Sequence, residues 1–390
     1  MNKVETKIFF TLFFSLFVSL IGVGIVVPLL PLYASKLGAS GLYIGMIFGS
    51  FSLSRSLFLP YFGSLSDRKG RKPFIIIGLF GYTIVSLAYI YSKSVESIIV
   101  IRFFHGIASA MLMPIIQAYI GDISSEGKEG YMMGMFNTSL FLGLSIGPIL
   151  GGIINEKWSL TASFLSMTAL STLGLLLSLI LLPPRRSEKI LKVHKPLGWK
   201  ILFKDKEIIG FFFLRFGYVF CIGMIWGFMP VFATKEFYLT SSQTGILLTL
   251  GVFISGSMQT PMGLLADKFN KVKMASIGGY IISIAIISFQ WSKGFWTLFL
   301  SNIFFGIGGG IAMPSLMALS VMKGKKLKEM GSVMGILTMA HSLGMMAGAI
   351  IAGMMMDIFE LKAAFAIATA VMFFCVNMFI WCVKPADVLV

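Results

Sequence analysis

Twelve long apolar segments, separated by short polar connections, constrain this 390-residue chain more than any other feature of its sequence. A helix needs about 20 residues, at about 1.5 Å each, to cross the roughly 30 Å hydrocarbon core of a bilayer. The segments do not alternate apolar and polar residues as membrane-spanning β-strands do, so we expect helices that satisfy their own backbone groups. The expected spans are 8–33, 42–66, 73–92, 96–121, 131–154, 160–182, 208–233, 242–266, 273–291, 295–321, 331–356 and 361–383.

Composition supports the membrane assignment. Apolar residues make up 57% of the chain and charged residues 12%, and the mean hydropathy is +0.90. Soluble domains have about 45–50% apolar and about 25% charged residues, so lipid must cover most of this protein's surface. The three cysteines all fall inside apolar segments without paired spacing, and therefore neither a disulfide framework nor a metal site is expected.

The basic residues indicate the orientation of the chain. Twenty-three of the 32 Lys and Arg residues fall on one side of the expected spans and six on the other, while three arginines lie within spans. Because Lys and Arg are enriched in cytoplasmic loops, we expect a multi-pass protein of the cell (plasma or inner) membrane with both termini cytoplasmic. The net charge of +16 does not predict nucleic-acid binding, because the basic residues form short runs between spans instead of one basic domain.

The chain consists of two related halves. The longest connection carries eight basic residues and divides the chain into an N-terminal six-helix bundle (1–183), a cytoplasmic linker (184–207) and a C-terminal six-helix bundle (208–390). A shift of about 200 residues places GSLSDRKGRK, from Gly63, over GLLADKFNKVK, from Gly263, and FFHGIASAMLMP, from Phe103, over IFFGIGGGIAMP, from Ile303. We therefore expect an all-α membrane protein whose two pseudo-symmetric halves expose a central site to either side in turn.

The whole chain resembles twelve-helix members of the major facilitator superfamily. GSLSDRKGRK is similar to the G-x-L-x-D-R-x-G-R-K loop of that superfamily. The resemblance implies a conformational latch on the cytoplasmic face, with Asp122 as the acidic partner at the end of the fourth span. The alternative is a basic loop that only enforces topology. The latch residues are Gly63, Asp67, Arg68, Gly70, Arg71, Asp122 and Asp267.

The fifth span contains GLSIGPILGG, which resembles the antiporter signature of the drug/proton antiporter branch. Glycines four residues apart allow two helices to approach closely, and a proline frees a backbone carbonyl and bends the helix. Ordinary small-residue packing is the alternative. The residues concerned are Gly143, Gly147, Pro148, Gly151 and Gly152. With the paired prolines of the first span, Pro28 and Pro31, this motif favours exporters over sugar importers.

Three arginines within spans predict a polar interior. Each costs roughly 2.5–3.5 kcal/mol on insertion scales unless it faces water or a partner. Arg102 resembles the basic residue of the superfamily's fourth helix, for which the resemblance implies a role in proton coupling, although His105 stands where that motif usually has glutamine. Arg102, His105, Ser109, Met113 and Gln117 follow one helical stripe, which we expect to line the transport path.

The other polar candidates have two interpretations each. His105 and His341 could titrate near neutral pH and relay protons, or they could only hydrogen-bond between helices. The intramembrane amides could line the path or join helices without touching substrate. The complete set of candidates for the substrate cavity or proton coupling is Arg55, Arg102, His105, Gln117, Asn137, Arg215, Gln259, Asn302 and His341.

All 16 acidic residues fall at span ends or in loops, so a cavity that contains the arginines would be positive and would attract anionic or zwitterionic amphiphiles. Alternatively, backbone carbonyls or carboxylates at helix ends neutralise the arginines. The sequence favours a secondary active transporter that exports small amphiphilic molecules or drugs, driven by protons through alternating access. The alternatives are a transporter of organic anions, siderophores or (lyso)lipids that uses the buried arginines and, more remotely, a non-transporting receptor or scaffold.

No enzyme motif, cofactor or metal is indicated by the sequence. The expected partners are a small-molecule substrate, protons and the lipid bilayer. Since one chain contains both halves of a path, we expect it to function as a monomer.

Overall fold

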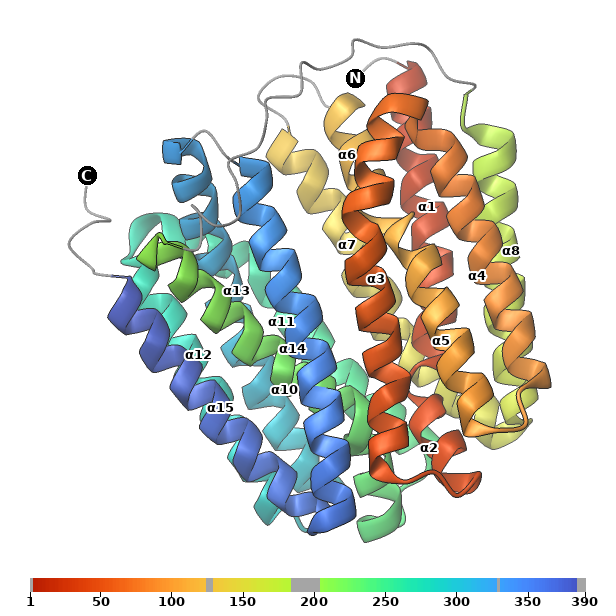
Figure 1. Ribbon diagram of the computed structural model, residues 1–390, viewed down its shortest axis with the longest axis vertical. Coiled ribbons are helices and arrows are strands. Elements are labelled where there is room, and N and C mark those ends of the chain that lie inside the picture. Colours follow the sequence, from red (N-terminus) through yellow and green to blue (C-terminus); the bar gives the residue numbers. More distant parts are fainter. Residues whose placement is uncertain (1–2, 124–128, 184–203, 328–329, 384–390) are drawn as a thin grey trace. The chain divides into compact units, whose positions relative to one another are not determined.

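The computed structural model describes residues 3–123, 129–183, 204–327 and 330–383 (Figure 1). Within these ranges all regular elements are helical, and twelve continuous or interrupted helices are long and apolar enough to cross a membrane. The expected all-α fold with twelve spans is confirmed. Of the predicted linker, 184–203 lies outside the described residues, and the next helix begins at Lys206.

The first half of the chain forms the helices α1 (Lys3–Val26), α2 (Leu29–Lys36), α3 (Gly41–Lys69), α4 (Arg71–Tyr91), α5 (Val95–Ala110), α6 (Met113–Ile123), α7 (Glu129–Lys157) and α8 (Leu160–Leu181). The second half forms α10 (Lys206–Phe237), α11 (Ser241–Lys268), α12 (Lys271–Ser288), the short 3₁₀ helix η1 (Phe289–Trp291), α13 (Phe295–Leu327), α14 (Met330–Ile358) and α15 (Leu361–Cys382).

Packing divides the chain into two compact units. Unit 1 comprises Met1–Ala39, Ser50–Val193 and Thr240–Thr249, and unit 2 comprises Ser40–Gly49, His194–Leu239 and Leu250–Val390. Each unit therefore contains most of one half together with a ten-residue segment from the other half.

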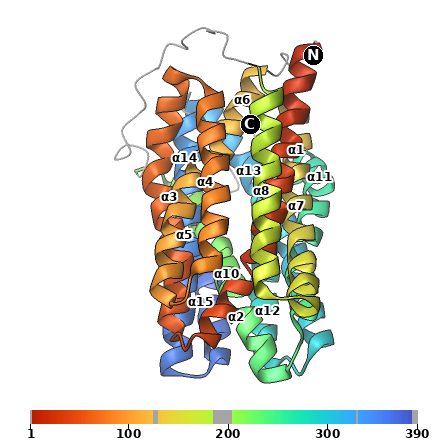
Figure 2. The same cartoon turned by 90° about the vertical axis from the view of Figure 1, so that its right-hand side faces the viewer.

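The sequence repeat is also a repeat of packing. In unit 1, α1 packs against α7 and α8, and α4 packs against α8 and α5 (Figure 2). In unit 2, α10 packs in the same way against α14 and α15, and α12 against α15 and α13. The predicted pseudo-symmetric halves are thus observed as equivalent helix pairs.

Two predicted spans are interrupted helices. The break between α1 and α2 falls at Val27 and Pro28, and the break between α5 and α6 falls at Met111 and Leu112, two residues before Pro114. Proline has no N–H to donate and its ring crowds the carbonyl four residues earlier, which disfavours a straight helix there. However, Pro314, the equivalent of Pro114, lies inside the continuous helix α13. Proline alone therefore does not decide where a helix breaks.

Both units have a packed interior and an apolar exterior. In unit 1, Leu12 and Leu16 of α1, Leu79 of α4, Ile116 of α6 and Phe136 of α7 are fully buried in one cluster. In unit 2, a ladder of rings joins α10, η1 and α15. Its members are Phe232, Phe289 and Phe365, with centroids 5.2 and 5.3 Å apart. Many large apolar side chains are exposed on the outside, as expected for surfaces that face lipid.

Candidate functional site

Arg102 of α5 is buried within unit 1, where only 2% of its surface is exposed. Its guanidinium carbon lies 4.3 Å from the centre of the Phe51 ring on α3, and its Nη1 lies 3.4 Å from Nδ1 of His105. Desolvated cation–π contacts stabilise a charge by about 2 kcal/mol. Because arginine only donates hydrogen bonds, Nδ1 of His105 must be the acceptor, and the imidazole in this geometry is neutral with its proton on Nε2.

The imidazole of His105 is enclosed by aromatic rings. Its centroid lies 4.7 Å from that of Tyr82 and 5.3 Å from that of Phe51, both edge to face. Only 1% of the residue is exposed, and its Nε2 has no hydrogen-bond partner among the described residues. An unsatisfied buried donor costs roughly 1–3 kcal/mol. A rearrangement that supplies an acceptor to this nitrogen would remove that cost.

Arg55 of α3 belongs to the same region of unit 1. A Cβ on Gly106 would collide with the backbone of Phe51 and with Ser54, so this glycine allows α5 to lie directly against α3. Arg55 is half-buried, and its Nε has no hydrogen-bond partner in the part of the chain that the structure describes. Tyr82 of α4 lies near both guanidinium groups. The helices α3, α4 and α5 thus bring two arginines and a histidine around one tyrosine.

A second arginine–imidazole pair lies in unit 2. Nη2 of Arg215, on α10, is 3.1 Å from Nδ1 of His341 on α14, and its Nη1 is 3.2 Å from Sδ of Met313 on α13. Arg215 and His341 are both half-buried. As in unit 1, the imidazole accepts through Nδ1 and is neutral in this arrangement. Arg102 aligns with Asn302 and Arg215 with Leu16 in the sequence repeat, so the two pairs are not repeat equivalents.

The predicted stripe along the fourth span is divided between two helices. Arg102, His105 and Ser109 lie on α5, whereas Gln117 lies on α6 beyond the break. The prediction assumed one continuous helix, and the turn at Met111 and Leu112 removes the regular spacing across it.

The amides differ in their surroundings. Asn302 is buried, and its Nδ2 donates to the Leu298 carbonyl at 2.9 Å and contacts Sδ of Met229 at 3.5 Å, an arrangement that serves packing. Gln117 and Gln259 are half-buried. Asn137 lies on α7, but its side chain is outside the described part of the structure.

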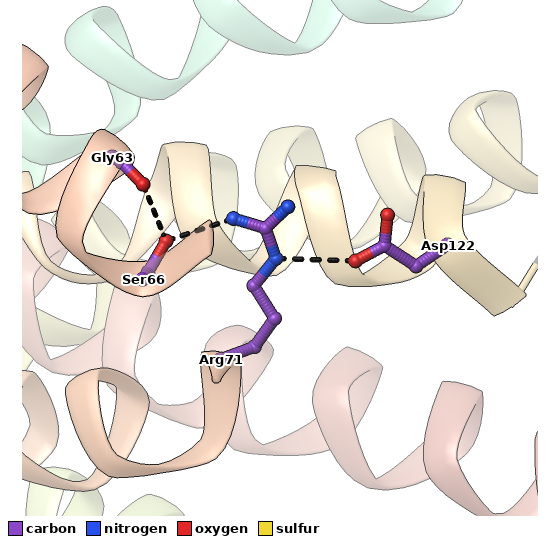
Figure 3. A network of polar contacts seen from close by, with 4 residues as sticks. All are labelled: Gly63, Ser66, Arg71 and Asp122. Atoms are coloured by element: carbon purple, nitrogen blue, oxygen red, sulfur yellow. Dashed lines mark hydrogen bonds and ion pairs between the residues drawn. The ribbon is translucent and has the colours of Figure 1, made fainter. Parts of the chain in front are cut away.

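The loop between α3 and α4 is joined to α6 by an ion pair (Figure 3). Nε of Arg71 lies 3.1 Å from Oδ2 of Asp122, and Nη1 donates to Oγ of Ser66 at 2.8 Å. The Ser66 hydroxyl in turn donates to the Gly63 carbonyl at 2.8 Å. Gly70 caps α4 with φ +93°, a conformation that favours glycine. Arg68 is exposed, and the side chains of Asp67 and Asp267 are not among those described.

Asp122→Asn is expected to change transport more than stability. Asp122 is 36% exposed, and such pairs contribute only about 0.2–1 kcal/mol to folding, so the unfolding temperature should move little. If the pair is part of a latch, the initial transport rate should fall several-fold, and the exchanged pair Arg71→Asp with Asp122→Arg should recover part of it. Full activity of Asp122→Asn would instead support a loop that only sets topology.

The glycines of α7 are the positions at which other helices of unit 1 pack closely against it. A Cβ on Gly147 would lie 2.5 Å from the Gly24 Cα on α1, and one on Gly143 would lie 2.9 Å from the Leu20 Cβ. Gly151 also faces α1, at Ile25, whereas Gly152 faces the start of α11. Pro148 lies inside α7 without interrupting it. The glycine motif therefore brings α7 into backbone contact with two other helices.

Carboxylates are confined to helix ends in the described parts of the chain, as the sequence predicted. There, no group of His, Cys, Asp and Glu side chains has the arrangement of a metal site. The buried polar side chains inside both units are mostly serines and threonines, together with Arg102, His105 and Asn302.

The sequence profile of the Major Facilitator Superfamily matches residues 12–222 and 211–388. The chain belongs to the major facilitator superfamily. This superfamily member is 30% identical, over 95% of its own length and 98% of the other chain, to an uncharacterized MFS-type transporter of Methanocaldococcus jannaschii. It is 25% identical to multidrug resistance protein 1 of Bacillus subtilis, over 87% of each chain.

A solved structure supports the same fold. The crystal structure of a mutant of the nucleoside transporter NupG matches the superfamily member with a TM-score of 0.80 at 14% identity, over 97% of this chain and 100% of the other. This match confirms the predicted major facilitator fold. The family profile and the multidrug resistance relative confirm the resemblance to the drug/proton antiporter branch. The protein is a multi-pass membrane transporter and not an enzyme.

The arginines and histidines of this transporter were predicted from the sequence, whereas their partners were not. Phe51 precedes Arg55 by four residues and so lies on the same face of α3, which was a usable signal. Tyr82 and Met313 carried no such signal, because they approach from other helices.

Proposed function

We propose that this transporter exports small amphiphilic molecules from the cell in exchange for protons, by alternating access, with both termini cytoplasmic. The arginine–imidazole pair in each unit is the observation that carries the proposal. The likeness to multidrug resistance protein 1 of Bacillus subtilis supports the substrate class. One chain contains both repeats, which is consistent with function as a monomer.

We infer that protonation of the pair in unit 2 changes the conformation of the transporter. Nδ1 of His341 accepts from Arg215 at 3.1 Å. A proton on Nδ1 turns the acceptor into a donor and sets an imidazolium against a guanidinium, which breaks the hydrogen bond. The pair joins α10 to α14, so taking up a proton would loosen one helix from the other. Imidazole is suited to this role because it changes charge near neutral pH.

His341→Gln is expected to uncouple transport from the pH gradient. The glutamine carbonyl can accept from Arg215, but the side chain cannot take up a proton. Efflux of a cationic dye from proteoliposomes should fall about tenfold with a gradient, which corresponds to about 1.4 kcal/mol, and should stop responding to the size of the gradient. Dye binding in detergent should persist. An Asn377→Gln variant would serve as control with an unchanged gradient response, because Asn377 bonds to Tyr280 and to the Phe373 carbonyl and is not among the candidates. An unchanged response of His341→Gln itself would remove His341 from proton coupling.

A second candidate is a transporter of organic anions, siderophores or (lyso)lipids. It is favoured by Arg55, whose buried Nε has no hydrogen-bond partner among the described residues, since an anionic group would supply the missing acceptor. The test compares a cationic dye with an anionic lipid-like probe in proteoliposomes, with and without a pH gradient. Transport of the anion that is lost in Arg55→Ala and Arg102→Ala would support this candidate. Export of the cation that is unaffected by both variants would exclude it.

A further inference from the structure

Two short segments pack with the opposite half of the chain. Ser40–Gly49, the start of α3, belongs to unit 2, and Thr240–Thr249, the start of α11, belongs to unit 1. The 200-residue shift of the sequence repeat superimposes these segments on each other. Each of these helices thus begins in one unit and continues in the other.

A carboxylate caps the segment in unit 2. Oδ1 of Asp357, at the end of α14, accepts from the Gly41 N–H at 2.6 Å, and Oδ2 accepts from the Leu42 N–H at 2.8 Å. The first N–H groups of a helix have no partner within the helix, and the N-terminus carries a partial positive charge. Both carboxylate oxygens of Asp357 therefore satisfy the first turn of α3.

The equivalent contact occurs in unit 1. Oε2 of Glu156, at the end of α7, accepts from the Ser242 N–H at 3.2 Å. Its neighbour Asn155 donates from Nδ2 to Oγ of Ser241 at 2.8 Å. Glu156 precedes Asp357 by about one repeat length, just as Gly41 precedes Ser241. The same arrangement of an acid at the end of one helix and the N-terminus of another helix is therefore present in both units.

Small residues bring the backbones together behind each cap. A Cβ on Gly45 would lie 2.6 Å from the Ala349 carbonyl oxygen in unit 2. In unit 1, a Cβ on Gly152 would lie 2.7 Å from the Ser242 Cα, and the Thr249 hydroxyl donates to the Ser145 carbonyl at 2.6 Å. Such contacts hold two helices together without a large apolar interface. Each segment is thus fixed to its neighbouring helix by close backbone packing and by a polar cap at its first turn.

We propose that Asp357 and Glu156 are positioning residues of the transport cycle. Their caps hold the first turn of α3 against α14 and the first turn of α11 against α7, and both caps release together in one step of the cycle. The assignment to a transport cycle rests on the proposed function, whereas the cap geometry does not. Helix caps are weak enough to be released and remade in an equilibrium between two conformations.

Labelling of single cysteines tests the proposal without a substrate. Ile44 and Thr244 are equivalent positions, and both are buried. Ile44→Cys and Thr244→Cys would be combined in turn with Asp357→Ala and Glu156→Ala, which remove every side-chain acceptor of the cap, and their reaction with a membrane-impermeant maleimide would be measured. The native cysteines Cys221, Cys375 and Cys382 are buried, and the parent protein supplies the background rate.

We expect either cap variant to raise labelling at both reporters by about 5- to 30-fold, the equivalent of about 1–2 kcal/mol for a lost cap. A merely local cap would raise labelling only at the reporter in its own unit, and that result, like unchanged rates, would overturn the proposal. Glu236→Ala is the matched control, because Glu236 pairs with Lys362 at 3.5 Å and the structure shows it capping no helix in the described parts. Asp357→Glu keeps the carboxylate and should restore slow labelling, which also shows that the variant chain folds.

Cross-linking tests whether release is needed for transport. Asn155→Cys with Ser241→Cys, joined by a short bis-methanethiosulfonate, should stop transport of the cationic dye, and a reductant should restore it. Each single-cysteine variant treated in the same way is the control. Transport that continues in the cross-linked protein would overturn the proposal. If the parent protein moves neither the dye nor the anionic probe, the proposed function fails, while the labelling result still decides whether the caps act together.

Discussion

Arg102→Met is expected to leave the protein folded, with an unfolding temperature equal to or above that of the parent, while transport falls at least about tenfold. Methionine keeps much of the volume of arginine but removes a charge that is only 2% exposed and carries a desolvation cost. It also removes the donor to Nδ1 of His105. A buried charge that does not stabilise the fold is best explained by a role in transport. The measurements are thermal unfolding in detergent and gradient-driven dye efflux.

Two control variants separate charge from volume. Arg102→Ala should lower the unfolding temperature, because it leaves a cavity beside Phe51 and His105. Asn302→Leu changes the equivalent position of unit 2, where the amide serves packing, and should affect stability more than transport. Arg102→Met with normal efflux and a lowered unfolding temperature would show that the arginine has a structural role.

Gly147→Leu is expected to abolish transport and to lower stability by about 1–3 kcal/mol or more. A Cβ at this position would lie 2.5 Å from the Gly24 Cα, and α1 could accommodate a leucine only by moving away from α7. Such a movement would also disturb Gly143 and Gly151, which face the same helix. The unfolding temperature and dye efflux, normalised to the amount of protein in the membrane, measure the effect.

Gly263→Leu is the matched control, since a Cβ on Gly263 meets nothing within 4 Å. It should change both quantities little. Equal effects of the two variants would show that a glycine-to-leucine change is harmful wherever it occurs in a helix of this protein. A tolerated Gly147→Leu would contradict the close contact between α1 and α7.

The two arginine–imidazole pairs place titratable side chains in an apolar interior. The described spans have no carboxylates away from their ends. Each histidine is held neutral by accepting from an arginine. The pairs differ in construction: Arg102 and His105 lie on one helix and are buried, whereas Arg215 and His341 join two helices and are half-buried. Unit 2 is therefore the better place to look for a proton that moves during transport, and unit 1 for a fixed charge.

The sequence by itself determined the number of spans and the repeat, because a bilayer demands about 20 apolar residues per helix and leaves few alternatives. It also showed that the buried basic residues do not follow the repeat, since residue identity needs no coordinates. The superfamily was already recognisable from the loop that begins at Gly63 and from the glycines of the fifth span.

Only the tertiary structure decided which residues meet. Arg215 and His341 are 126 positions apart, and Asp357 reaches Gly41 across 316 positions, separations over which spacing along a helix predicts nothing. The same limit applies to helix breaks, because Pro114 and Pro314 are equivalent in sequence, yet only the first lies next to an interruption. Sequence periodicity indicates which face of a helix is polar, but the residues that contact this face depend on the neighbouring helices. Whether a proline interrupts a helix depends on the packing of those neighbours as well.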